Sequence, residues 1–302
     1  MLTINEFQRE IEKHFMNYLG PTFQDTEMKF CPVHKTNCLK TGINFIQKKP
    51  DNGTIPTIYL EDMYEYYLDH GNLNDTLTAF AMHVKNCPRL MGDHSIVRTA
   101  DYILDHVFVQ LINRTKNEEL LTQLPHADFL DLAAVFRVQV DLDGDKQGAS
   151  YLLTYEIMKE CHLDLVSITR KACQNYIRIF GQFRIISIKD MYPAGINLPD
   201  TDFNGPSMYL IINESIRYGA AAMFACPELF RGISTQLDSD LIIIPSSIHE
   251  LIIVEAESTM ETMGKDNIYE MVHSVNQECV EKEEVLSDTV YVYSRKHGFD
   301  IL

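Results

Sequence analysis

Two short apolar blocks near the C-terminal end constrain the fold more than any other feature of this chain. Residues 241–244 and 251–254 consist only of leucine, isoleucine and valine, and six mostly polar residues separate them. Blocks this rich in β-branched side chains predict strands that are buried on both faces. We therefore expect them to be neighbouring strands at the centre of a sheet. The connection, residues 245–250, is called the 245–250 loop below.

The 245–250 loop carries the candidate site residues Ser246, Ser247, His249 and Glu250. Polar groups between buried strands must find hydrogen-bond partners or meet solvent, and such loops often carry function. One hypothesis is a hydrolase in which Ser247 or Ser246 is the nucleophile and His249 the base, with Glu250 or Asp288 as the orienting acid. No glycine-flanked nucleophile turn surrounds either serine, which favours the alternative that these side chains hydrogen-bond the loop backbone.

The remainder of the chain predicts an α+β fold. Before residue 120 we expect a smaller α+β region, with a helix over 4–19, a hairpin from strands over 27–33 and 39–47, a strand over 57–60, and two helices that end before Pro88. Residues 102–112 fit a strand, with a helix in the first half as the alternative. The predicted boundary lies between residues 120 and 121, although the whole chain could form one compact unit.

From residue 121 to residue 302 the pattern predicts successive ββα units in an antiparallel or mixed sheet, with the helices on one side. The expected strands cover 129–140 and 151–156, then 208–213 and 219–226, then the central pair, and finally 289–293. The expected helices follow these pairs, with one over about 168–179, one opened by Pro227 and one opened by a capping box at Ser258.

Composition excludes several classes of function. A formal net charge of −17 opposes direct binding to nucleic acid, because the field repels phosphate backbones. No apolar run approaches the roughly 20 residues that a membrane span needs, and the N-terminus lacks the features of a secretory signal. The seven cysteines are scattered, which favours a soluble protein in a reducing cytoplasm over a disulfide-stapled secreted domain.

Metal sites have only weak candidates. Cys31, His34 and Cys38 are close in sequence, but a structural zinc site needs a fourth ligand, and no second cysteine–histidine cluster is present. Asp141, Asp143 and Asp145 resemble the start of a calcium loop, yet the glycine and glutamate that such a loop requires are absent. We therefore expect no metal and no cofactor.

Several motifs along the chain carry a resemblance. They include residues 56–60, 111–113 with 116–118, 125–133, 219–221, 244–250, and 284–288 with Val290 and Tyr291. Together they resemble an uncharacterised bacterial family with a domain of unknown function, about 300 residues long, with a Pro-Ser-Ser-Ile-His-Glu signature at 245–250. This resemblance implies a bacterial, cytoplasmic protein and supplies no activity, substrate or catalytic residue.

The leading hypothesis is a non-catalytic cytoplasmic binding or regulatory protein, whose ligand is a small molecule or another protein. The hydrolase is the first alternative. The second is an acidic inhibitor that occupies a basic partner, with Glu278, Glu281, Glu283 and Glu284 as its densest run of acids. The sequence leaves open whether the protein is an enzyme, and its oligomeric state.

Overall fold

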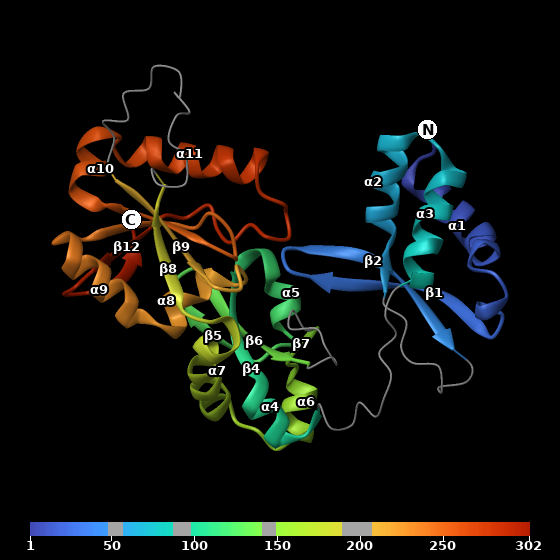
Figure 1. The fold of residues 1–302 in the computed structure, drawn as a ribbon, viewed down its shortest axis with the longest axis horizontal. Coiled ribbons are helices and arrows are strands. Elements are labelled where there is room, and N and C mark those ends of the chain that lie inside the picture. Colours follow the sequence, from blue (N-terminus) through green and yellow to red (C-terminus); the bar gives the residue numbers. More distant parts are fainter. Residues whose placement is uncertain (48–56, 87–97, 141–148, 189–206) are drawn as a thin grey trace. The chain divides into compact units, whose positions relative to one another are not determined.

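The computed structural model describes residues 1–47, 57–86, 98–140, 149–188 and 207–302 (Figure 1). The chain divides into two compact units, Met1–His94 and Ser95–Leu302. This division falls earlier than the predicted boundary at residue 120, because β4 (Val107–Asn113) pairs along its whole length with β6 (Leu132–Gln139) and so belongs to the second unit.

The first unit contains three helices and a three-stranded sheet within the described residues. The elements are α1 (Ile4–Leu19), the 3₁₀ turn Pro21–Phe23, β1 (Thr26–Lys35), β2 (Cys38–Gln47), β3 (Ile58–Tyr59), α2 (Leu60–His70) and α3 (Leu73–Asn86). The expected capping box opens α1, because Thr3 accepts from the Glu6 N–H while the Glu6 side chain accepts from the Thr3 N–H. The buried residues of α1 are Phe7, Ile11, Phe15 and Leu19, at helical spacing, and they face the core of this unit.

An antiparallel six-stranded sheet forms the centre of the second unit, in the order β13-β12-β10-β11-β9-β8. Its strands are β8 (Phe183–Ser187), β9 (Met208–Asn213), β10 (Leu241–Ile244), β11 (Leu251–Glu255), β12 (Tyr291–Ser294) and β13 (Gly298–Ile301). The two apolar blocks are β10 and β11, which pair with Ile243 opposite Ile253. The prediction of a buried central strand pair is confirmed.

Both faces of this sheet are covered, which is why β10 has no polar residue. Leu241 and Ile243 belong to the main core, together with Phe230 of α9 (Pro227–Leu237). Ile242 and Ile244 face the other way and pack with Ile268 and Val272 of α11 (Lys265–Glu278). Figure 1 shows α11 on one side of the sheet and α9 on the other. The expectation that the helices gather on one side is therefore wrong.

A second antiparallel sheet shares the main core. In it β6 lies between β4 on one side and β5 (His126–Phe129) and β7 (Ser150–Leu152) on the other. The helices and helical turns of this half are α4 (Ala100–His106), a 3₁₀ turn at Thr115–Asn117, α5 (Glu118–Leu121), α6 (Tyr155–Glu160) and α7 (Leu165–Phe180). The buried residues Ile168, Ala172 and Tyr176 of α7 join this core, and α5 covers the opposite face of β6.

The α+β class is confirmed, but the regular ββα units are not. Residues 219–226, expected as a strand, form the 3₁₀ turn Gly219–Ala221 and α8 (Ala222–Ala225). The expected strand over 151–156 ends at Leu152, since Thr154 caps α6. The helix α10 (Ala256–Thr262) begins before Ser258, so the predicted capping box there is wrong. Residues 102–112 combine both alternatives, as α4 followed by β4, and the aspartate turn at 141–145 lies outside the described residues.

Candidate functional site

The 245–250 loop is fixed by backbone hydrogen bonds to two segments that are distant in sequence. The N–H groups of Gly219 and Ala220 donate to the carbonyls of His249 and Ile248 over 2.9 and 3.3 Å. The Ile248 N–H in turn donates to the Glu284 carbonyl over 2.9 Å. The loop therefore lies between residues 217–221 and the segment that follows α11, and three of the motifs that carry the family resemblance meet here.

The two serines of the loop bind within the loop itself. The Ser246 hydroxyl donates to Glu250 Oε1 over 3.0 Å, and the Ser247 hydroxyl accepts from the main-chain N–H of His249 over 3.0 Å. Ser247 is also buried, at 7% exposure. These are the local turn contacts that the alternative to the hydrolase hypothesis predicts.

Both ring nitrogens of His249 face other groups. Nδ1 accepts from the main-chain N–H of Tyr218 over 3.1 Å, and Nε2 lies 3.3 Å from Glu284 Oε1. Because Nδ1 is an acceptor, the neutral ring carries its proton on Nε2, where it is directed at the carboxylate. A histidine base would instead need a free nitrogen directed at a nucleophile. Among the described residues, neither serine hydroxyl hydrogen-bonds this ring.

The segment opposite the loop has an unusual backbone. Tyr218 adopts a left-handed conformation, with φ of 54° and ψ of 27°, which is uncommon for an aromatic residue. The next residue must be glycine, because a Cβ at Gly219 would lie 2.2 Å from the His249 carbonyl oxygen. The Tyr218 carbonyl accepts from the buried Tyr176 hydroxyl over 2.6 Å. Both polar groups of the Tyr218 backbone are thus held, one of them by His249.

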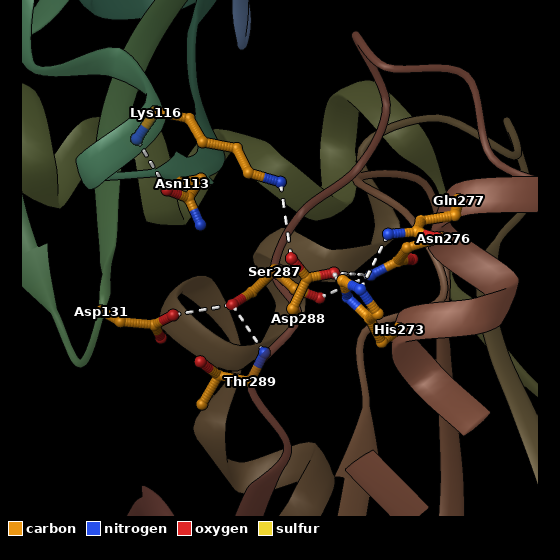
Figure 2. A network of polar contacts seen from close by, with 9 residues as sticks. All are labelled: Asn113, Lys116, Asp131, His273, Asn276, Gln277, Ser287, Asp288 and Thr289. Carbon is orange, nitrogen blue, oxygen red and sulfur yellow. Dashed lines mark hydrogen bonds and ion pairs between the residues drawn. The ribbon is translucent and has the colours of Figure 1, made fainter. Parts of the chain in front are cut away.

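A polar network lies beside the loop, where the segment 284–289 meets the β5–β6 turn (Figure 2). Ser287, only 1% exposed, donates to Asp131 Oδ2 over 2.7 Å and accepts from the Thr289 N–H over 3.0 Å. The hydroxyl of Tyr291, which is fully buried, donates to Asp131 Oδ1 over 2.8 Å. Burial raises the pKa of Tyr291 and the charge of Asp131 adds to the rise, so this hydroxyl remains a donor at neutral pH.

Asp288 forms the exposed side of the same network. Figure 2 shows Lys116 and His273 directed at its carboxylate, with Lys116 Nζ 3.7 Å from one oxygen and His273 Nδ1 3.8 Å from the other. Asn276 donates to Asp288 Oδ1 over 2.9 Å and to the Ser287 carbonyl over 3.0 Å. Asp288, proposed as an orienting acid for His249, is thus bound to other partners, and the carboxylate nearest His249 is that of Glu284.

Sequence reasoning did not assign roles to Tyr218, Asp131 or Ser287, and it named Glu284 only as part of the acidic run. All of these except Tyr218 lie within motifs that carry the family resemblance. The signal that would have found them was the combination of those motifs, since the fold brings the motifs at 125–133, 219–221, 244–250 and 284–288 together. No local pattern around Tyr218 indicated its role, which depends on a contact across 31 positions of the chain.

The weak metal candidates do not converge. Cys31 and Cys38 lie on one face of the β1–β2 hairpin, opposite Gly42 and Lys35, while His34 lies on the other face opposite Leu39. Cys31 Sγ accepts from Asn44 Nδ2 over 3.0 Å. Within the ranges that the structure describes, no group of three histidine, cysteine or acidic side chains is placed to hold a metal ion.

The fold and this site define a two-unit α+β protein, in which polar loops gather around one end of the central strand pair. The chain matches the model of a family of unknown function, DUF5688, over residues 4–295, and it belongs to that family. Searches of curated proteins and of solved structures gave no match. In the part of the chain that the structure describes, no helix has the length and apolar character to cross a membrane.

Proposed function

We propose that this protein is a non-catalytic binding protein, in which the 245–250 loop is a scaffold for a neighbouring recognition surface. The observation that carries the proposal is the environment of His249, whose Nδ1 accepts from the Tyr218 N–H while Nε2 faces Glu284. A ring held in this way positions Tyr218 and has no nitrogen left for a serine nucleophile. We also propose a cytoplasmic location, which the scattered cysteines support.

The test compares stability with activity in the same variants. His249→Ala removes one partly buried hydrogen bond to the Tyr218 backbone and one contact to a carboxylate, each worth roughly 1 kcal/mol. We expect the denaturant midpoint to fall by an amount corresponding to about 1–2 kcal/mol, with an unchanged slope. The matched control is His297→Ala, since His297 is an exposed residue of the same unit, and its midpoint should remain that of the parent.

The activity arm uses a panel of chromogenic esters, amides and phosphoesters at neutral pH. We expect no turnover above a heat-inactivated sample for the parent protein, Ser246→Ala or Ser247→Ala. The proposal fails if the parent hydrolyses a substrate and either serine variant abolishes that hydrolysis. It also fails if His249→Ala is as stable as the parent or more stable, because a scaffold residue must contribute to stability.

A further inference from the structure

The backbone of the turn at residues 214–218, called the 214–218 turn below, contains two left-handed residues that are not glycine. Ile216 has a φ of 51°, and Tyr218 has a φ of 54°. This conformation is unfavourable for β-branched and aromatic residues, and it persists only where neighbouring groups enforce it. The groups that hold the turn therefore determine whether it keeps its shape.

Three side chains from outside the turn hold its backbone. Asn213 is fully buried; its Nδ2 donates to the Arg217 carbonyl over 2.6 Å, and its Oδ1 accepts from the Arg217 N–H over 3.2 Å. The buried Tyr176 hydroxyl donates to the Tyr218 carbonyl over 2.6 Å. His249 Nδ1 accepts from the Tyr218 N–H over 3.1 Å.

Of these three groups, only the imidazole changes its hydrogen-bonding character near neutral pH. An asparagine amide does not titrate, and burial raises the pKa of Tyr176, so that its hydroxyl remains a donor. An imidazole takes up a proton between about pH 8 and about pH 5, and both of its nitrogens are then donors. A protonated Nδ1 cannot accept from the Tyr218 N–H, whereas Nε2 keeps its proton directed at Glu284 Oε1, 3.3 Å away.

The charged and titratable groups around the His249 ring come from every segment that packs against it. They are Glu284 from the segment after α11, the Tyr218 ring and Arg217 from the turn, Arg137 from β6 at the same tyrosine ring, and Glu250 from the loop itself. Among the described residues, the acid that pairs with His249 is Glu284. A protonated ring therefore keeps a partner on the side of Glu284 and loses one on the side of Tyr218.

We propose that His249 is a pH-sensitive switch, which holds the 214–218 turn while its ring is neutral and releases the turn when the ring is protonated. Release leaves the Tyr218 N–H without its acceptor, and a partly buried N–H without a partner is unfavourable. The strain at Ile216 and Tyr218 then favours a different backbone. This inference rests on the proposed binding function, to which it adds regulation by pH of the surface that the loop supports.

The experiment measures amide hydrogen exchange by NMR on the full chain from about pH 8 to about pH 5, with each rate corrected for its intrinsic dependence on pH. We expect the protection of the Tyr218 amide to fall about tenfold or more in acid, because its hydrogen bond is lost. The Ile248 amide donates to the Glu284 carbonyl, and it should keep its protection, which would show that the loop remains folded.

Two variants separate this imidazole from the other groups that titrate. His249→Asn places an amide oxygen near the position of Nδ1 and takes up no proton, so its Tyr218 protection should not change with pH. His297→Ala removes an exposed histidine of the same unit, and it should respond as the parent does. If His249→Asn does not fold, nitrogen-15 spectra of the parent imidazole provide the test. They should show a proton on Nε2 alone at about pH 8 and on both nitrogens at about pH 5.

Three results would overturn the switch. They are a Tyr218 protection that does not depend on pH in the parent, an equal fall of that protection in His249→Asn, and a neutral ring that carries its proton on Nδ1. A missing pH response leaves the proposed binding function standing, because the tests of that function are made at neutral pH. That function fails separately, if His249→Ala is as stable as the parent.

Discussion

The main-chain N–H of Tyr218 donates to Nδ1 of His249 over 3.1 Å, although 31 positions separate the two residues. This bond joins the 245–250 loop to a residue with a left-handed backbone. A left-handed conformation is costly for an aromatic residue and persists only where its surroundings enforce it. The surroundings here are the His249 ring, the close approach at Gly219 and the Tyr176 hydroxyl.

The first prediction concerns Gly219. In Gly219→Ala the new Cβ would lie 2.2 Å from the His249 carbonyl oxygen, so one of the two backbones must move. We expect the free energy of unfolding to fall by about 2 kcal/mol or more, measured by denaturant titration. Gly232→Ala is the control, because Gly232 is an exposed position of α9 with nothing within 4 Å of a new Cβ. That variant should gain about 0.5–1 kcal/mol. Equal effects at both positions would contradict the close approach.

The second prediction concerns the hydroxyl of Tyr291. Tyr291→Phe removes its bond to Asp131, and a hydrogen bond to a charged group contributes about 1.5–3 kcal/mol, so we expect a loss in that range. Tyr293→Phe is the matched control, because Tyr293 lies on the same strand and in the same core. Among the described residues no hydrogen bond of its hydroxyl is present, and the expected loss is below about 0.5 kcal/mol. A double-mutant cycle that combines Tyr291→Phe with Ser287→Ala would measure how strongly the two hydrogen bonds to Asp131 are coupled.

The third prediction concerns β10, which is buried on both faces. Ile243→Asp and Ile242→Asp place a carboxylate in two different cores, and each should prevent cooperative folding, because an unpaired buried charge costs several kcal/mol. Ile185→Asp is the control, since Ile185 lies on edge strand β8 and is 43% exposed. Soluble yield and thermal unfolding by circular dichroism provide the measurement. A stable Ile242→Asp protein would show that α11 does not exclude water from its face of the six-stranded sheet.

The fourth prediction is that the purified protein carries no stoichiometric zinc. His34 lies on the opposite face of the hairpin from Cys31 and Cys38, so the three side chains cannot share one ion without rearrangement. Native mass spectrometry of protein prepared without chelators is the measurement. The prediction is wrong if one zinc per chain is found and the double variant Cys31→Ser with Cys38→Ser loses it.

The elements that were predicted correctly are those whose own residues determine which of their faces are buried and where they begin. Residues 241–244 contain no polar side chain, so only burial on both faces suits them, and α1 carries both its cap and its apolar stripe within one segment. Residues 219–226 misled the prediction, because their alanines fit a strand or a helix equally well. A left-handed turn at Tyr218 precedes them, and the N–H of Tyr218 donates to His249 from elsewhere in the chain.

The position of the candidate site in the chain was predictable from the sequence, but the residues from other loops that contact it were not. Ser246, Ser247, His249 and Glu250 were singled out because polar residues between buried strands are conspicuous. Their partners Tyr218 and Glu284 come from other loops. Such contacts arise from topology, and no pattern within a short window of sequence contains them.

The last prediction concerns the capping box of α1. The backbone and side-chain hydrogen bonds with Thr3 hold the pKa of Glu6 below its ordinary value of 4.5. Because the folded-state pKa is depressed, the stabilisation by Glu6 is present above pH 4.5 and is lost as the pH falls through the folded-state pKa. An NMR titration of the Glu6 carboxyl group should show the low pKa directly. Thr3→Ala should return this pKa towards 4.5, whereas Thr78→Ala, which alters an exposed threonine within α3, should leave it unchanged. An unperturbed Glu6 in the parent protein would mean that the capping box does not form in solution.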